Sequence, residues 1–267
     1  MSAAIQGRLA GLCRHPVKGF TPEPLDEVRL TPERGFPFDR VWAVENGPCG
    51  FDPARPAFVP KQKFTVLASL PQVAAATTRY DEASGVLHAS AEGHAPFAGR
   101  LEAEAGRVAF AAWLGGVLEA AQGPLKVLEG PGEHRFTDHP QGQVSLINLA
   151  SVRDLSEQAG VELDPVRFRA NLYVEGWPAW IENGWIGETL ELGGVRAKVL
   201  KSIVRCAATH VNPRTALRDV DVTRALFETY GHMFCGIYLN VTVAGRLALG
   251  DVCAGPAGAP IRERAPA

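Results

Sequence analysis

The first third of the chain is a series of short hydrophobic segments that proline, glycine and polar residues interrupt. Runs of this length, bounded by turn-forming residues, are typical of β-strands in a small barrel or sandwich. Between residues 47 and 60, four prolines and two glycines predict a loop. We therefore predict strands over 8–13, 25–30, 41–45, 64–67, 73–80 and 86–89.

Further along the chain, hydrophobic residues recur at helical spacing. Val108, Ala111 and Leu114 lie on one face of an amphipathic helix, which Gly123-Pro124 ends. Glycines also follow two later periodic segments at the C-cap position. The pattern predicts helices over 107–121, 149–159 and 221–230, and strands over 125–128, 168–174, 195–204 and 233–243.

These elements predict a mostly β fold with a few helices (α+β), arranged as a two-part barrel. The helix over 107–121 separates two sets of strands, so we place the domain boundary there. The domains would comprise residues 1–122 and 123–255. Residues 256–267 are rich in Ala, Pro and Gly, and we expect them to be disordered.

Composition narrows the function classes. A formal net charge of -2 over 267 residues gives no global attraction to nucleic acid or anionic membranes, so any anion site must be local. There is no apolar run of membrane-spanning length and no signal-peptide core, so we expect a cytoplasmic protein without nucleic-acid or membrane partners. Five widely spaced cysteines, with no Cys-x-x-Cys pair, argue against a disulfide framework, a structural zinc site or an iron–sulfur cluster.

Cys206 has the most informative surroundings in the chain. It follows the strand predicted over 195–204, and Arg205 precedes it. A strand end can hold a cysteine rigidly for a metal or a reaction, and a neighbouring guanidinium favours the thiolate. A lone cysteine in an apolar run is also often a small buried hydrophobic residue, so these residues alone leave both interpretations open.

The segment 202–213 resembles the cysteine motif of MOSC domains, named after the C-terminal domain of molybdenum cofactor sulfurases. Other segments match in the family's order: 16–19 (its Pro-Ile-Lys-Ser turn), 38–42 (Asp-Arg-Phe-Trp), 144–149 (Val-Ser-Leu-Leu), 168–171 (Phe-Arg-Pro-Asn) and 234–251 (closing strand and Gly-Asp turn). The resemblance spans residues 6–253 and extends to bacterial relatives of the mitochondrial amidoxime-reducing component. It implies a MOSC-type β-barrel preceded by a smaller N-terminal β-barrel-like domain.

The resemblance also implies a cofactor. MOSC reductases hold a molybdenum–molybdopterin cofactor (Mo-molybdopterin), and Cys206 matches the cysteine that ligates the metal. A thiolate is a soft, donating ligand suited to a metal that changes oxidation state. Lys18, Arg40 and Arg169 are the matching cations for the cofactor's phosphate, with Arg205 beside the metal ligand. As ordinary side chains they would be solvated surface charges.

Polar candidates surround these positions. Asn171 follows Arg169 by two residues, so on an extended strand both side chains would point to one face. Ser145 and Asn148, at the start of the helix over 149–159, could bind the pterin or phosphate, or serve as plain helix caps. Thr209 could bond the pterin edge or only fix the turn after Cys206.

The implied activity is that of a molybdenum-dependent oxidoreductase that reduces N-hydroxylated small molecules. Cys206 and His210 are the catalytic candidates, since a histidine suits proton donation near neutral pH. No ferredoxin-like cysteine set follows residue 253, so electrons would come from a separate electron-transfer protein. Gly19 stands where amidoxime-reducing members have serine, which removes one hydrogen bond to the cofactor phosphate.

Two other functions fit the same residues. Cys206 could carry a persulfide, as proposed for this domain when it is fused to pyridoxal phosphate-linked sulfurases; a cysteine desulfurase would then be the partner. Alternatively, the chain could be a non-catalytic carrier of the molybdenum cofactor. All three functions depend on Cys206.

Overall fold

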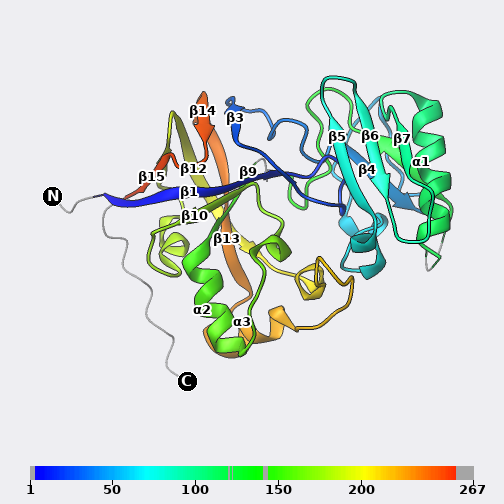
Figure 1. The fold of residues 1–267 in the computed structure, drawn as a ribbon. Coiled ribbons are helices and arrows are strands. Elements are labelled where there is room, and N and C mark those ends of the chain that lie inside the picture. Colours follow the sequence, from blue (N-terminus) through cyan, green and yellow to red (C-terminus); the bar gives the residue numbers. More distant parts are fainter. Residues whose placement is uncertain (1–3, 120, 122, 141–143, 257–267) are drawn as a thin grey trace.

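The structure is a computed structural model that describes residues 4–119, 121, 123–140 and 144–256, and its centre is a closed seven-stranded barrel (Figure 1). The strands follow one another as β10, β9, β13, β12, β11, β15 and β1, and β1 pairs again with β10. Only β9 and β10 run parallel; the other neighbours in the barrel are antiparallel. The strands are β1 (Ile5–Arg14), β9 (Val144–Asn148), β10 (Leu172–Glu175), β11 (Thr189–Leu192), β12 (Val195–Val204), β13 (Phe234–Val243) and β15 (Val252–Gly255).

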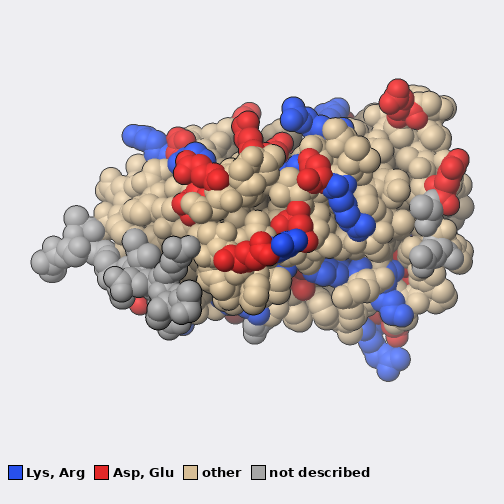
Figure 2. Space-filling view, turned by 90° about the horizontal axis from the view of Figure 1, so that it is seen from below, with Lys and Arg blue, Asp and Glu red and all other residues tan. Residues whose placement is uncertain are grey.

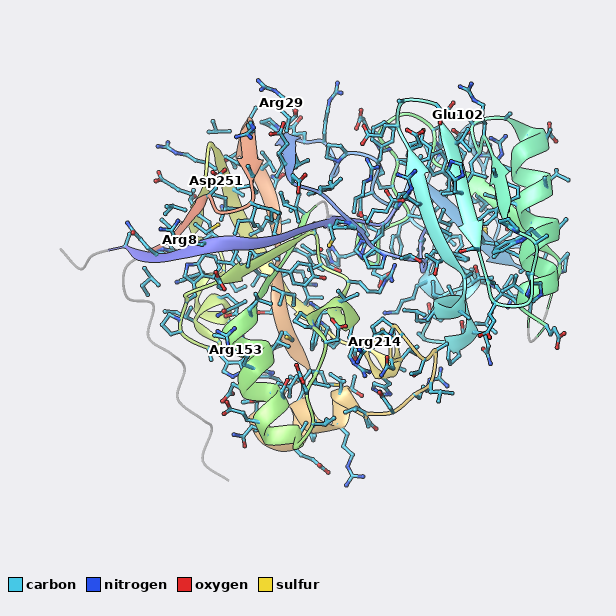
Figure 3. The ribbon with its side chains drawn as sticks, in the orientation of Figure 1. Arg8, Arg29, Glu102, Arg153, Arg214 and Asp251 are labelled. Atoms are coloured by element: carbon cyan, nitrogen blue, oxygen red, sulfur yellow. The ribbon has the colours of Figure 1, made fainter. Side chains whose placement is uncertain are left out.

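Alternating side chains fill the barrel. Along β12, Val195, Ala197 and Val199 are buried and the residues between them are exposed, as the two-residue period of a strand requires. Trp177 and Trp185 belong to the same core, and their rings meet edge to face with centroids 4.9 Å apart. Where the barrel closes, Arg8 on β1 lies near Asp251 (Figure 3) and donates to the Gly250 carbonyl over 3.3 Å.

A smaller lobe lies beside the barrel (Figure 1). It contains a two-stranded sheet, a three-stranded sheet and one helix, packed around Trp42, Tyr80 and Phe110. A further strand pair, β3 with β14, lies next to the barrel, and β2 pairs antiparallel with the end of β1. These elements are β2 (Glu23–Pro24), β3 (Glu27–Leu30), β4 (Trp42–Asn46), β5 (Thr77–Asp81), β6 (Val86–Ser90), β7 (Phe97–Gly99), α1 (Glu104–Val117), β8 (Leu125–Glu129) and β14 (Gly245–Ala248).

The mostly β architecture with two barrel-like parts is confirmed, but the two parts exchange strands. β1 precedes residue 122 and lies in the large barrel, whereas β8 follows it and pairs with β4 of the small lobe. The boundary at residue 122 itself stays a prediction. Of the predicted tail 256–267, the residues from 257 onward lie outside the described part of the chain.

Two helices confirm the predicted end signals. Before α2 (Leu149–Ala159) the Asn148 side chain accepts from a backbone N–H, and Gly160 follows with a φ of 67°. Asp221 caps α3 (Val222–Tyr230) in the same way. In the described part of the chain, no helix is long and apolar enough to cross a membrane.

Three predicted strands are wrong in whole or in part, because prolines start short 3-10 helices in or before them. Residues 64–67 form one isolated bridge and a turn, and Pro71 opens a helical turn where the strand over 73–80 was expected. Asp164 caps a similar turn that ends in Arg169. The short helices are η1 (Lys61–Lys63), η2 (Pro71–Ala75), η3 (Pro165–Phe168), η4 (Ile181–Trp185) and η5 (Ala207–His210).

Candidate functional site

A cavity of about 350 Å³ lies where the small lobe meets the end of β12. Its described lining contains one cysteine, Cys206, and one acidic residue, Asp138. Lys and Arg are interspersed with Asp and Glu on the face that Figure 2 shows, whereas basic residues dominate the cavity. They are Lys18, Arg40, Lys61, Arg169, Lys201 and Arg205.

Cys206 is held at the cavity by the end of β12. Its backbone is extended, and it is the first residue before η5, where the Thr209 hydroxyl donates to the Cys206 carbonyl over 2.9 Å. The Cys206 side chain is half-buried, and it lies close enough to Lys61 for the two groups to interact. Burial lowers the pKa of Lys61, but Asp138 and the Cys206 thiol raise it more, so a cation stands at the sulfur.

That cation is not the expected one. Arg205 lines the cavity, but it is buried and donates to the Phe168 carbonyl over 2.8 Å and to the Cys235 carbonyl over 2.7 Å. Neighbouring side chains on an extended backbone point to opposite faces, which turns Arg205 away from Cys206. Arg205 thus ties β12 to β13, and Lys61 supplies the charge that the sequence had suggested for Arg205.

Lys18 is almost fully buried at the cavity floor. It donates to the Phe136 carbonyl over 2.9 Å and forms an ion pair with Asp138. Burial lowers the pKa of Lys18, and Asp138 raises it only in part. The adjacent Gly19 has a φ of 93°, and a Cβ there would lie 2.6 Å from the Thr65 carbonyl oxygen. This turn therefore excludes a serine on steric grounds.

Arg40 and Arg169 face one another across the cavity wall. The Arg40 guanidinium pairs with Asp39 and donates to the Arg169 carbonyl over 3.0 Å. Burial lowers the pKa of Arg169 to about 10, and Arg40 contributes to that shift. Beneath them, burial and the same two arginines lower the pKa of His15 to about 3. The site therefore holds excess positive charge that an anionic ligand would neutralise.

Other candidates lie behind the cavity wall. Ser145 lines the cavity, but its hydroxyl donates to the Asn171 side chain over 2.8 Å, and Asn171 donates in turn to the Cys13 carbonyl. The expected shared face of Arg169 and Asn171 is wrong, because Arg169 has a φ of 52° and no strand runs through it. Asn148 caps α2, and its amide donates to Glu182 over 2.9 Å.

His210 lies outside the described lining of the cavity that contains Cys206. Its Nε2 is 3.0 Å from the Thr223 hydroxyl and 3.1 Å from Asp221, at the start of α3. The side chain follows Cys206 closely in sequence, but η5 turns the chain between them. Its geometry is that of a residue that fixes a helix start.

Sequence reasoning missed several lining residues. Lys61 lies in the proline-rich loop region, and Asp138 and His139 lie in a segment whose pattern indicates only a loop. His139 stacks on Tyr238 with ring centroids 5.8 Å apart, and its Nε2 is 3.3 Å from the Lys201 Nζ. Lys201 and Tyr238 are opposite one another on β12 and β13, so strand pairing was the signal that could have revealed them.

Two family models agree with this architecture. The family model described as MOSC domain matches residues 133–254, and the one described as MOSC N-terminal beta barrel domain matches residues 6–120. Among solved structures, the YuaD protein from Bacillus subtilis resembles the chain with a TM-score of 0.46 and 13% identity, over 95% of this chain and 97% of that chain.

Two groups of curated relatives cover part of the chain. Molybdenum cofactor sulfurase of Caenorhabditis elegans is 31% identical over 122 residues, which cover 44% of this chain and 16% of that protein. Mitochondrial amidoxime reducing component 2 of Rattus norvegicus is 28% identical over 120 residues, covering 40% of this chain and 35% of that protein. In both cases well under half of the relative's length is matched.

Proposed function

Since the chain belongs to the MOSC family and carries that family's N-terminal barrel domain ahead of its MOSC domain, we propose that it binds the molybdenum cofactor in the basic cavity and reduces N-hydroxylated compounds. The relatives named for molybdenum cofactor sulfuration and amidoxime reduction support a cofactor-related role. The single observation that carries the proposal is that Cys206 shares one small cavity with six cationic side chains.

The lining fits the chemical groups of such a cofactor. Lys18, Arg40 and Arg169 would hold a phosphate. Burial lowers the pKa values of Lys18 and Arg169, so a dianion beside them would offset that cost, whereas the pair with Asp39 raises the pKa of Arg40. Arg40 offers a planar fork, whereas Lys18 acts as a point charge. Cys206 would ligate molybdenum, with Lys61 beside the sulfur. The hydrogen bond from the Thr209 hydroxyl to the Cys206 carbonyl would hold the first turn of η5 in place.

In the reaction, two electrons and two protons cleave the N–O bond and give the amine and water. When bound, the cofactor would supply a metal centre that accepts the oxygen atom. The chain's own residues would position the ligand. A separate electron-transfer protein would deliver the electrons.

Metal content tests this proposal. Protein from a host that produces the molybdenum cofactor should contain near-stoichiometric molybdenum and pterin, and Cys206→Ala should lose most of the metal because its thiolate ligand is gone. Cys49→Ala is the matched control, since Cys49 is also half-buried but is not part of the described cavity lining. If Cys206→Ala kept its molybdenum, the proposed ligand would be wrong.

A persulfide carrier is the second candidate, and the contact between Lys61 and Cys206 favours it specifically. Lys61 places a positive charge beside the sulfur that would attack a sulfur donor. A cysteine desulfurase and cysteine should then add one sulfur atom to the intact mass, and a reducing agent should remove it. An unchanged mass would reject this function. Full metal loading with no turnover of any N-hydroxylated compound would instead indicate a non-catalytic cofactor carrier.

A further inference from the structure

Three exposed apolar residues lie together beside the basic cavity. Val204 ends β12 and lines the cavity rim, and 52% of it is exposed. Phe234 is its register partner on β13 and is 37% exposed, and Met233 precedes it at 40%. Strand partners place their side chains on the same face of a sheet. Val204 and Phe234 therefore form one continuous surface, which we call the rim shelf.

The rim shelf is held rigidly from beneath. His232 stacks on Phe234 with centroids 5.0 Å apart and accepts the Phe234 backbone N–H over 3.1 Å. Tyr230 stacks behind His232. The Arg205 backbone N–H donates to the Met233 carbonyl over 2.8 Å, which fixes both strand ends to each other. Exposed apolar groups on such a preformed support favour ligand binding.

The position of the shelf indicates what it would bind. Val204 precedes Cys206 by two residues on extended backbone, so the two side chains lie on the same side of the chain. A cavity of about 350 Å³ is at the small end of the range of roughly 300–1,000 Å³ for sites that enclose one ligand. With a cofactor in the cavity, the body of a substrate has to lie over the rim.

We infer that Val204 and Phe234 bind the hydrocarbon part of the substrate and select N-hydroxylated compounds that carry an aromatic or other bulky apolar group. This inference rests on the proposed function. The cavity interior sets cations beside its apolar residues, whereas the shelf presents apolar side chains at the rim, so the shelf supplies a contact that distinguishes a phenyl from a methyl substituent. Apolar contact of this size changes kcat/KM by about tenfold or more.

The test compares two N-hydroxylated compounds that differ only in a phenyl or a methyl group. In the molybdenum-loaded protein, Val204→Ser and Phe234→Ser should each lower the phenyl-to-methyl ratio of kcat/KM by about tenfold. Phe227→Ser is the control, because Phe227 is 62% exposed on α3 and is not part of the described lining. It should leave the ratio unchanged. Molybdenum content and thermal midpoint identify any variant that fails to load or fold.

A second measurement separates failure of the shelf from failure of the proposed function. Benzyl alcohol, added to the full chain with ¹³C-labelled methyl groups, should shift the Val204 and Met233 resonances saturably, and Phe234→Ser should abolish the shift. Inactivity with both compounds, together with the shift, refutes the reductase function and keeps the apolar site. The inference is overturned if benzyl alcohol does not shift these resonances. It is also overturned if the shelf variants keep the phenyl-to-methyl ratio of kcat/KM but raise the KM for the electron donor, a result that would make the shelf a protein-docking surface.

Discussion

Single residues give the cavity its charge and its shape. Lys61 lies beside the Cys206 sulfur. Asp39 raises the pKa of Arg40, whereas burial and the neighbouring Arg40 lower the pKa of Arg169. Gly19 acts through its backbone alone. Its φ of 93° belongs to the region that favours glycine, and the Thr65 carbonyl occupies the space of a side chain. A serine at position 19 would therefore require the backbone of Gly19 or Thr65 to move.

Replacing Gly19 with serine tests this interpretation. We expect the free energy of unfolding to fall by about 1–3 kcal/mol, because the new Cβ meets a backbone oxygen in a strained conformation. Urea denaturation measures the loss. Gly47→Ser is the matched control, since Gly47 has a φ of 81° but a Cβ there would meet no described atom within 4 Å, so its cost is conformational only. Equal losses in both variants would show that the Thr65 contact is unimportant.

At the scale of elements, regular patterns were predictable and irregular segments were not. The strand that carries Cys206 follows from its two-residue period, and α2 and α3 follow from their capping residues. Of the cavity's cations, Lys18, Arg40 and Arg169 were predicted only through the family resemblance. Lys61 and Asp138 lie in segments without periodicity, and they join Cys206 in the cavity lining through tertiary contacts that no local pattern encodes.

One buried carboxyl group connects α2 to η4. Asn148 and Ser151 donate to Glu182 over 2.9 and 2.8 Å, and the side chain is fully buried. Burial raises the pKa of Glu182 to about 7, although these two hydrogen bonds lower it in part. The native state therefore binds this proton more tightly than the unfolded chain, whose glutamates have a pKa near about 4.3.

The sign of the pH effect follows. Protonated Glu182 stabilises the native state by on the order of 1–3 kcal/mol. This stabilisation is fully present below about pH 4 and is lost as the pH rises to about 7. Glu182→Gln removes the titrating group and should flatten the dependence. Urea unfolding of both proteins at several pH values between about 4.5 and 7.5 measures the difference. Parallel pH profiles would contradict the assignment of the raised pKa to Glu182.

At the scale of the whole molecule, the strand exchange joins the two lobes. β1 belongs to the barrel and β8 to the small lobe, although each lies on the other side of the predicted boundary. The cavity also takes residues from both, with Lys18 and Lys61 from the first half of the chain and Cys206 from the second. Neither half can complete its own sheet or the site alone.

We therefore expect the described fold to unfold in one cooperative transition. Scanning calorimetry should give a single peak whose calorimetric and van't Hoff enthalpies agree. A protein with two independent domains would instead show two transitions. Pyrophosphate should move the whole peak to higher temperature, because an anion bound in the shared cavity stabilises both lobes together.

The place of β1 also matters while the protein is being made. Ile5 lies opposite Gly255, and Arg8 lies opposite both Glu175 and Val252, so β1 leaves the ribosome well before either of its barrel partners, β10 and β15. At about 5–20 residues per second, this delay is on the order of tens of seconds. During that time an apolar strand has two unpaired edges, which makes nascent chains of this protein natural clients of chaperones.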